Sequence, residues 1–216
     1  MSERAAFPRR TSIVTAAAAK DLTILATFKT RLGITTSTDD ALHNTLIHEA
    51  SAAICKHCRR EFARETLLDR YRAPHATDVL YLSRRPVAAI DSIVEDGVTL
   101  VAADYELDAK VGRLWRLDAS GDPIYWTGQR PISVQHQSGW TLLEELPSDI
   151  ENACIEMVKF LWYSRSGDPR LRSESIPGLG DIGYALPGAS GGMGMTRGLP
   201  DTVAGLLTDY IDPALP

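Results

Sequence analysis

The sequence predicts an α+β protein: a small helical bundle with an inserted antiparallel β region and an extended C-terminal tail. Three observations lead to this fold class. Apolar residues recur at three- and four-residue steps in 21–65 and again in 146–168, as on one face of a helix. Between them, 66–142 alternates apolar and polar residues and carries frequent turn residues, as short strands do. After Pro169, glycine and serine replace large apolar residues.

The first twenty residues are expected to form a poorly ordered N-terminal arm. They contain arginines and an alanine run but lack the long leucine-rich core of a secretory signal. A targeting role is therefore disfavoured, and the first folded segment is expected to begin at residue 21.

Residues 21–65 are expected to form two helices joined by a short polar loop. Thr23 is a candidate cap for the first helix, and Gly33 ends it. Ser37 and Asp40 have the spacing of a capping box that starts the second helix. The expected buried stripe of the second helix consists of Leu42, Leu46, Ile47, Ala50, Ala53, Ile54 and Phe62. Its expected solvent side consists of His43, Glu49, Lys56, Arg59 and Arg60.

The β region, 66–142, is expected to form an antiparallel sheet or a small sandwich. Asp96-Gly97 has the sequence of a tight hairpin turn between two of its strands. The expected strands are 67–72, 79–82, 87–94, 98–101, 105–107, 113–117 and 132–136.

The segment 146–168 is expected to form a long core helix. Ser148 is its candidate N-cap, Gly167 fits a left-handed C-cap, and Pro169 prevents continuation. The apolar stripe consists of Ile150, Ala153, Cys154, Met157, Val158, Leu161 and Trp162. Burying these side chains contributes about 1.5–3 kcal/mol for each large one, and ordering the backbone costs about 1–2 kcal/mol per residue. The helix must therefore pack on other elements.

The tail, 169–216, is expected to be flexible and to end in a short helix that begins near Pro200. The apolar stripe of this helix consists of Val203, Leu206, Leu207 and Tyr210. Two interpretations stay open. The helix holds a partner, or it folds back on its own domain.

The whole-chain composition narrows the class of protein. A formal net charge of −5 argues against a general nucleic-acid binder, although local basic clusters remain compatible with it. The strongly apolar stretches are far shorter than a membrane span. Three cysteines, an odd number, favour a reducing interior over a disulfide framework.

Cys55-Lys56-His57-Cys58 is the one arrangement with metal-ligand spacing. Zinc would need four ligands, and only Cys154 could add a third thiolate. Because the motif lies inside an amphipathic helix, buried thiols are favoured over a zinc site or a redox pair. We therefore expect no metal and no cofactor, and keep a small zinc-stabilised interaction module using Cys55 and Cys58 as the alternative.

Other chemistry finds little support in the sequence. His43, His75 and His136 have no recognisable metal or nucleophile spacing, and His136 is expected to face solvent or to form hydrogen bonds within a strand. No nucleophile-elbow or metalloprotease motif is present, so no catalytic residue is assigned. A hydrolase would require a carboxylate or histidine with a strongly shifted pKa in a cleft.

A candidate subunit or docking interface lies at the end of the long helix and in the tail. Aromatic residues beside arginines are typical of interface anchors. The alternative is an ordinary solvated helix end. The candidate interface residues are Trp162, Tyr163, Arg165, Asp168, Arg170, Arg172, Leu206 and Tyr210.

Short motifs follow one another in a recognisable order along nearly the whole chain beyond residue 20. They are 22–34, 39–42, 51–54, 59–62, 105–107, 112–115, 132–134, 139–140, 146–150, 173–178 and 198–200. This order resembles that of the head–tail connector proteins (adaptor or head-completion proteins) of long-tailed bacteriophages and gene transfer agents. Cys55-Lys56-His57-Cys58 is not part of the resemblance.

The resemblance implies a non-enzymatic virion protein of the neck, at the head–tail junction, assembled in the host cytoplasm. It implies docking on the portal protein, a ring of neighbouring copies, and contact with a stopper, neck or tail-terminator protein; no membrane is involved. Genomic DNA would pass through the ring without sequence-specific binding. About twelve copies of a chain with a charge of −5 would carry about −60 around this channel, which opposes adhesion of DNA.

Overall fold

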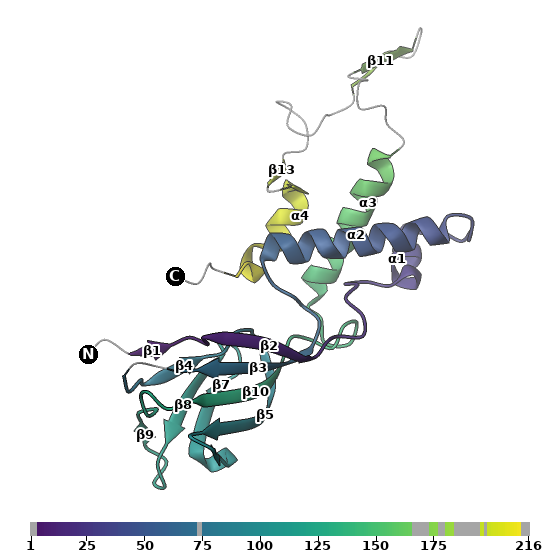
Figure 1. Cartoon of the computed structure of the whole chain (residues 1–216). Coiled ribbons are helices and arrows are strands. Elements are labelled where there is room, and N and C mark those ends of the chain that lie inside the picture. Colours follow the sequence, from purple (N-terminus) through teal and green to yellow (C-terminus); the bar gives the residue numbers. More distant parts are fainter. Residues whose placement is uncertain are drawn as a thin grey trace. The chain divides into compact units, whose positions relative to one another are not determined.

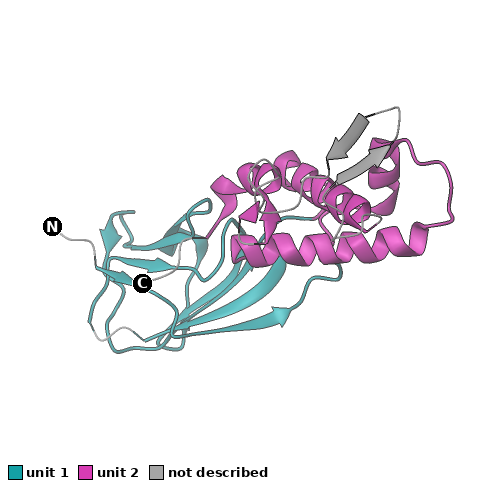
Figure 2. Ribbon diagram, turned by 90° about the horizontal axis from the view of Figure 1, so that it is seen from above, with its two compact units in different colours: residues 1–19, 63–141 teal, residues 20–62, 142–216 magenta. Residues whose placement is uncertain are grey.

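The computed structural model describes residues 4–72, 75–165, 195–196 and 198–212, together with the backbone of 173–176 and 180–183. The chain divides into two compact units (Figure 2). The β unit consists of Met1–Ala19 and Ala63–Thr141, and the helical unit consists of Lys20–Phe62 and Leu142–Pro216. The α+β fold class is confirmed.

The β unit contains two five-stranded sheets, so the sandwich is the form that the β region takes. The first sheet has the order β1-β4-β8-β7, with β9 paired to β8. Its strands are β1 (Ala5–Ala6), β4 (Val79–Tyr81), β7 (Tyr105–Asp108), β8 (Arg113–Leu117) and β9 (Pro123–Ile124), and the 3-10 turn η1 (Ala102–Asp104) precedes β7. The second sheet has the order β2-β3-β10-β5-β6 (Figure 1). Its strands are β2 (Arg10–Thr15), β3 (Glu65–Tyr71), β5 (Val87–Glu95), β6 (Val98–Thr99) and β10 (Ile132–Ser138).

The expectation of a poorly ordered N-terminal arm is wrong for residues 5–15. Ala5 and Ala6 pair in parallel with Val79 and Leu80, and β2 pairs antiparallel with β3. These pairings join residues far apart in the sequence, and Arg10–Thr15 lacks the apolar-polar alternation that identifies a strand locally. The two strands therefore form through tertiary pairing.

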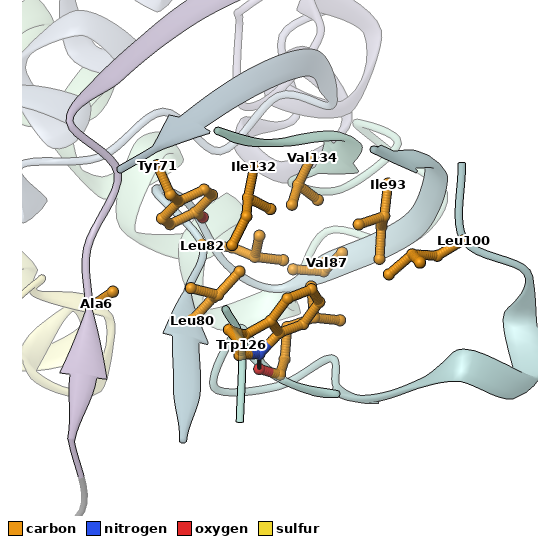
Figure 3. Packing of buried hydrophobic residues seen from close by; sticks show 11 residues of the cluster. Ala6, Tyr71, Leu80, Leu82, Val87, Ile93, Leu100, Trp126, Ile132 and Val134 are labelled. Atoms are coloured by element: carbon orange, nitrogen blue, oxygen red, sulfur yellow. Dashed lines mark hydrogen bonds between the residues drawn. The ribbon is translucent and has the colours of Figure 1, made fainter. Parts of the chain in front are cut away.

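Apolar side chains from both sheets meet in the core of the β unit. Figure 3 shows Tyr71, Ile132, Val134 and Ile93 facing Leu80 and Trp126. Trp126 has no exposed surface, and its indole N–H donates to the carbonyl oxygen of Leu114 at 3.1 Å. The polar atom of this large side chain is thus satisfied inside the core.

The predicted hairpin at Asp96-Gly97 is present between β5 and β6. Asp96 has φ 51° and Gly97 has φ 83°, the two positive values that a type I′ turn requires. Asp-Gly supplies this geometry because glycine has no Cβ and aspartate tolerates the left-handed region.

The described residues of the helical unit form four α-helices (Figure 1). These are α1 (Leu25–Leu32), α2 (Asp40–Cys58), α3 (Ser148–Ser164) and α4 (Asp201–Leu206), followed by the 3-10 turn η2 (Thr208–Tyr210). Gly33 ends α1 at φ 67°, as expected. Gly167 and Pro169, the expected end of α3, lie outside the described residues.

The expected side-chain caps are not formed. Thr23 instead donates its hydroxyl hydrogen to Glu151 at 3.1 Å, so it joins α3 to the segment before α1. Asp40 accepts from Lys29 at 2.7 Å rather than completing a capping box. The N-cap of α3 is Pro147, without a side-chain bond. Tertiary partners have replaced the local ones.

The placement of His43 on the solvent side of α2 is wrong. Its side chain is only 2% exposed, and its ring lies 5.2 Å from that of Phe28 and 4.3 Å from that of Trp162. His43 lies three and four residues before Leu46 and Ile47, both buried, so it shares their helical face. Phe62, predicted within the stripe of α2, is buried beyond the end of the helix.

The last helix folds back on the helical unit. Leu199, Val203 and Leu207 are buried, and the backbone N–H of Asp212 donates to the carbonyl oxygen of Cys58 at 2.9 Å. Two short strands, β13 (Met195–Thr196) and β14 (Leu199–Pro200), precede α4. Farther back, β11 (Ser173–Ile176) pairs with β12 (Gly180–Gly183), and the remainder of the expected flexible segment lies outside the described residues.

In the part of the chain that the structure describes, none of the helices combines the length and the hydropathy needed to cross a bilayer.

Candidate docking surface

The C-terminal end of α3 carries a cluster of ring contacts around Trp162. The His43 ring lies 4.3 Å from the indole, tilted by 46°, and the guanidinium carbon of Arg165 is also 4.3 Å from the centre of the indole. The side chain of Trp162 is half-buried. Trp162 and Arg165, two of the predicted interface residues, come together in this cation–π pair.

Tyr163, the next residue, has 64% of its side chain exposed. It lines an open groove of about 240 Å³ between α3 and α4. The remaining residues along this groove are Glu156, Lys159, Phe160, Ser164, Pro200, Thr202 and Val203. We call it the α3–α4 groove. Sequence analysis selected Tyr163 but missed the groove, because α4 meets α3 only in the folded unit.

Leu206 and Tyr210 differ in their surroundings. Leu206 leaves 39% of its side chain exposed on α4. Tyr210 is half-buried, with its ring 6.4 Å from that of Phe62 in an edge-to-face arrangement. Burial, followed by the charges of Asp149 and Asp209, raises the pKa of Tyr210. Leu206 is thus available to a partner, whereas Tyr210 also holds the last helix in place.

Asp168, Arg170 and Arg172, the other predicted interface residues, lie outside the described residues.

The Cys55-Lys56-His57-Cys58 motif has the properties of a structural segment. Burial raises the pKa of Cys55 to about 11, and burial likewise raises the pKa of Cys58 to about 11. Zinc binds the thiolate, so protonated buried thiols are poor ligands. Within the described part of the chain, no group of three or more His, Cys, Asp or Glu side chains is arranged to hold a metal ion. The zinc-stabilised module therefore has no geometric support.

Chelation should leave the protein unchanged. Overnight treatment with excess EDTA is expected to shift the melting temperature by less than about 1 °C, because burial disfavours the thiolate forms of Cys55 and Cys58 that zinc would need. Differential scanning fluorimetry before and after treatment measures this. A fall reversed by added Zn²⁺, and absent in Cys55→Ser, would restore the zinc interpretation.

A network of buried polar side chains lies at one end of the second sheet in the β unit. The carboxylate of Asp69, with no exposed surface, faces His136 Nε2 at 3.0 Å. It also accepts from the Thr11 hydroxyl at 2.6 Å and from the Ser83 backbone N–H at 2.7 Å. Burial alone would raise the pKa of Asp69, but these three hydrogen bonds outweigh it and hold the pKa below its ordinary value.

His136 forms hydrogen bonds through both of its ring nitrogens. Nδ1 lies 2.8 Å from the hydroxyl oxygen of Ser138, and this hydroxyl donates to the carbonyl oxygen of Arg84 at 3.1 Å. Nε2 faces the Asp69 carboxylate at 3.0 Å. The hydrogen-bonded role, one of the two expected for His136, is the one found.

The buried network has the residue types of a hydrolytic triad, Asp69, His136 and Ser138, but not the arrangement that a triad needs. A triad histidine accepts the proton of its serine, whereas Ser138 already donates its hydrogen to Arg84. Asp69 and His136 are 0% exposed and Ser138 is 1% exposed, so a substrate cannot reach them. The network stabilises the sheet and offers no hydrolytic site.

The lowered pKa of Asp69 predicts a loss of stability in acid. An aspartate in the unfolded chain titrates near about 3.9. The contribution of Asp69 is therefore fully present above that pH and is lost as the pH falls through its lower folded-state pKa. Urea unfolding between pH 5 and pH 2 should show a steeper decline for the wild type than for Asp69→Asn. Parallel declines would contradict the assignment.

Comparisons with known proteins concern the chain as a whole. Neither a protein-family model nor a curated protein matches the sequence. Solved structures do match. A chain from the neck of an empty gene transfer agent particle, computed with C6 symmetry, is 21% identical with a TM-score of 0.56, over 96% of this chain and 97% of that one.

Two further structures agree with the first. A chain from the neck of a native particle, computed with C12 symmetry, is 20% identical with a TM-score of 0.55, over 96% of this chain and 97% of that one. A chain of the native gene transfer agent virion is 18% identical with a TM-score of 0.56, over 95% of this chain and 97% of that one. The whole chain therefore has the fold of these neck and virion chains.

Proposed function

We propose that this chain is a structural subunit of the neck of a bacteriophage or gene transfer agent particle, where it acts as a head–tail connector. The observation that carries the proposal is a likeness of fold over 95–96% of the chain to neck and virion chains. The order of sequence motifs points to the same class independently. The role is structural rather than enzymatic, since the triad-like side chains of the β unit are buried and already paired.

In this proposal the subunits form a ring. The similar neck structures were computed with C6 and with C12 symmetry, and twelve equivalent copies satisfy both. The ring would dock on the portal, pass the genome through its centre, and present its other side to a stopper, neck or tail-terminator protein.

The α3–α4 groove is the proposed docking surface. It presents the exposed Tyr163, and Leu206 is exposed on α4, one of the two helices that form the groove. A few anchor side chains of this kind supply most of the binding free energy at protein interfaces. The chain leaves α3 at this end and continues into 166–194, which includes Asp168, Arg170 and Arg172. These three residues are proposed to extend the same interface.

Electron microscopy of particles made without this gene tests the function. Heads separated from complete tails are expected, because the joint between them would be missing. Complementation with the intact gene should restore joined particles. Normal infectious particles in the absence of the gene would refute the connector role.

The groove itself is tested by Leu206→Asp and Tyr163→Asp. Each places a charge on an exposed apolar contact, so we expect a folded monomer whose incorporation into particles falls at least about tenfold, the equivalent of 1.4 kcal/mol. Asn44→Asp, which adds the same charge at an exposed position of α2, is the control. Quantitative immunoblots of purified particles provide the measurement, and equal incorporation of all variants would exclude this surface.

A further inference from the structure

Five exposed arginines gather along one edge of the β unit. We call Arg4, Arg9, Arg10, Arg70 and Arg72 the arginine edge. None of them forms an ion pair with another residue that the structure describes. The chain has a formal net charge of −5, so without these five residues the remainder would be twice as negative. The arginine edge is therefore a local basic cluster on a chain that is negative as a whole.

Strand pairing brings the arginines together. Arg10 lies directly opposite Arg70 in the register of β2 and β3, and the backbone N–H of Arg9 donates to the carbonyl oxygen of Arg70 at 2.8 Å. Arg72 follows Arg70 by two residues, the spacing at which side chains along an extended chain share a face. Like charges directly opposite one another weaken strand pairing. The fold maintains this arrangement although neither Arg10 nor Arg70 forms an ion pair within the part of the chain that the structure describes.

The arginine edge continues into a pocket. Arg4, Arg72 and His75 line an open space of about 500 Å³, together with Ala5, Phe7 and Thr77. Asp78, which follows Thr77 in the sequence, accepts a hydrogen bond from the backbone N–H of Arg4 through its carboxylate at 2.6 Å. This bond holds the start of the N-terminal strand, so the carboxylate is engaged by backbone. The pocket thus joins two arginines of the edge, Arg4 and Arg72, across a lining that otherwise contains small and apolar residues and His75.

We propose that the arginine edge binds the phosphate groups of duplex DNA without reading its sequence. Guanidinium groups bind phosphate bidentately, and hydroxyl donors such as Ser133, which lies opposite Arg70 on β10, commonly add neutral contacts. The choice of DNA as the polyanion rests on the proposed neck function, in which the genome passes each subunit. The negative charge of the rest of the chain keeps such contacts few and reversible.

Salt dependence of binding tests the inference on the full chain. Fluorescence anisotropy with a labelled 30-base-pair duplex of arbitrary sequence measures affinity between 50 and 200 mM KCl. Five phosphate contacts predict a slope of about −4.5 in log K against log salt, and a fall of about 500-fold over this range. Arg70→Gln/Arg72→Gln should reduce the slope to about −2.7 and the fall to about 40-fold.

A matched control removes the same charge elsewhere. Arg31→Gln/Arg130→Gln replaces one exposed arginine on α1 and one that pairs with Asp96, and it should keep the slope of the wild type. Circular dichroism verifies that all variants are folded. Absence of binding at 50 mM KCl, or equal losses in both double variants, overturns the proposal.

Competition identifies the chemical class of the anion. If poly-L-glutamate competes as well as DNA at equal charge, the edge recognises carboxylates of a protein surface and the DNA proposal is wrong. DNA that competes far better supports it. The two proposals are tested separately, because DNA binding is measured on the free chain. A chain that enters particles but does not bind DNA would contradict only the DNA proposal, and a chain that binds DNA but is not needed for joined particles would contradict only the neck function.

Discussion

Asp69→Ala is expected to lower the free energy of unfolding of the β unit by about 3–5 kcal/mol, since it leaves the buried ring of His136 and two further hydrogen-bonding groups without the carboxylate that they face. The two further groups are the Thr11 hydroxyl and the Ser83 backbone N–H. These donors come from β2 and from the segment after β4, so one carboxylate joins parts of the chain that pair with different sheets.

Urea unfolding monitored by tryptophan fluorescence measures this loss, because Trp115, Trp126 and Trp140 all lie in the β unit. The control is Asp91→Ala, which removes an exposed carboxylate of β5 that accepts from Gln137 at 2.8 Å. Its effect should stay within about 0.5 kcal/mol. Equal effects of the two substitutions would show that the buried network contributes no more than a surface hydrogen bond.

Trp126→Ala is expected to destabilise the β unit by about 3–5 kcal/mol, the usual cost of removing a large aromatic side chain from a packed core. Trp126 is fully buried between the two sheets (Figure 3), and the carbonyl oxygen of Leu114 would lose its indole donor. A cavity would remain where Leu80 and Leu114 now pack.

The neighbouring Tyr125 provides the comparison. It has 61% of its side chain exposed, so Tyr125→Ala should change the free energy of unfolding by no more than about 0.5 kcal/mol. Urea unfolding followed by circular dichroism suits both variants, because it does not depend on the tryptophan that is removed. A small effect of Trp126→Ala would mean that the two sheets do not enclose a tightly packed core.

Elements with a strong local pattern could be predicted from the sequence. The stripe of α3, the glycine that ends α1 and the Asp96-Gly97 turn each depend on residues only a few positions apart. The strands β1 and β2 could not, because their partners lie in β4 and β3, far along the chain, and their own residues carry no alternation. Local physics specifies the first group, and only tertiary pairing specifies the second.

The polar interior was harder to predict, although part of its signal is present in the sequence. Glu65 and Asp69 alternate in phase with Leu67 and Tyr71, which places them on the buried face of β3. His43 is likewise in phase with Leu46 and Ile47 on α2. Residue type alone predicts that these polar side chains are exposed, because burying them is costly. Their phase relative to the apolar residues predicts the burial that is found.

The candidate docking surface divides in the same way. Tyr163 and Leu206 could be selected from their residue types and from their positions near the ends of helices. The α3–α4 groove, which Tyr163 lines, could not, because it exists only where α4 returns to α3. The arginine edge was also beyond sequence analysis, since Arg10 and Arg70 become neighbours only through the register of β2 and β3.

The two ends of Ala63–Thr141, the longer segment of the β unit, lie next to each other. Ala63 bridges to Trp140, and the backbone N–H of Arg64 donates to the carbonyl oxygen of Trp140 at 2.9 Å. Before the β unit folds, α2 and α3 flank a loop of about 90 residues, residues 59–147, and the closure entropy of this loop opposes their meeting. Once the β unit has folded, the effective loop is only about ten residues, which lowers the closure cost by about 2 kcal/mol. The inserted unit thus promotes pairing of the two helices that flank it, and the chain is expected to fold in that order, β unit first.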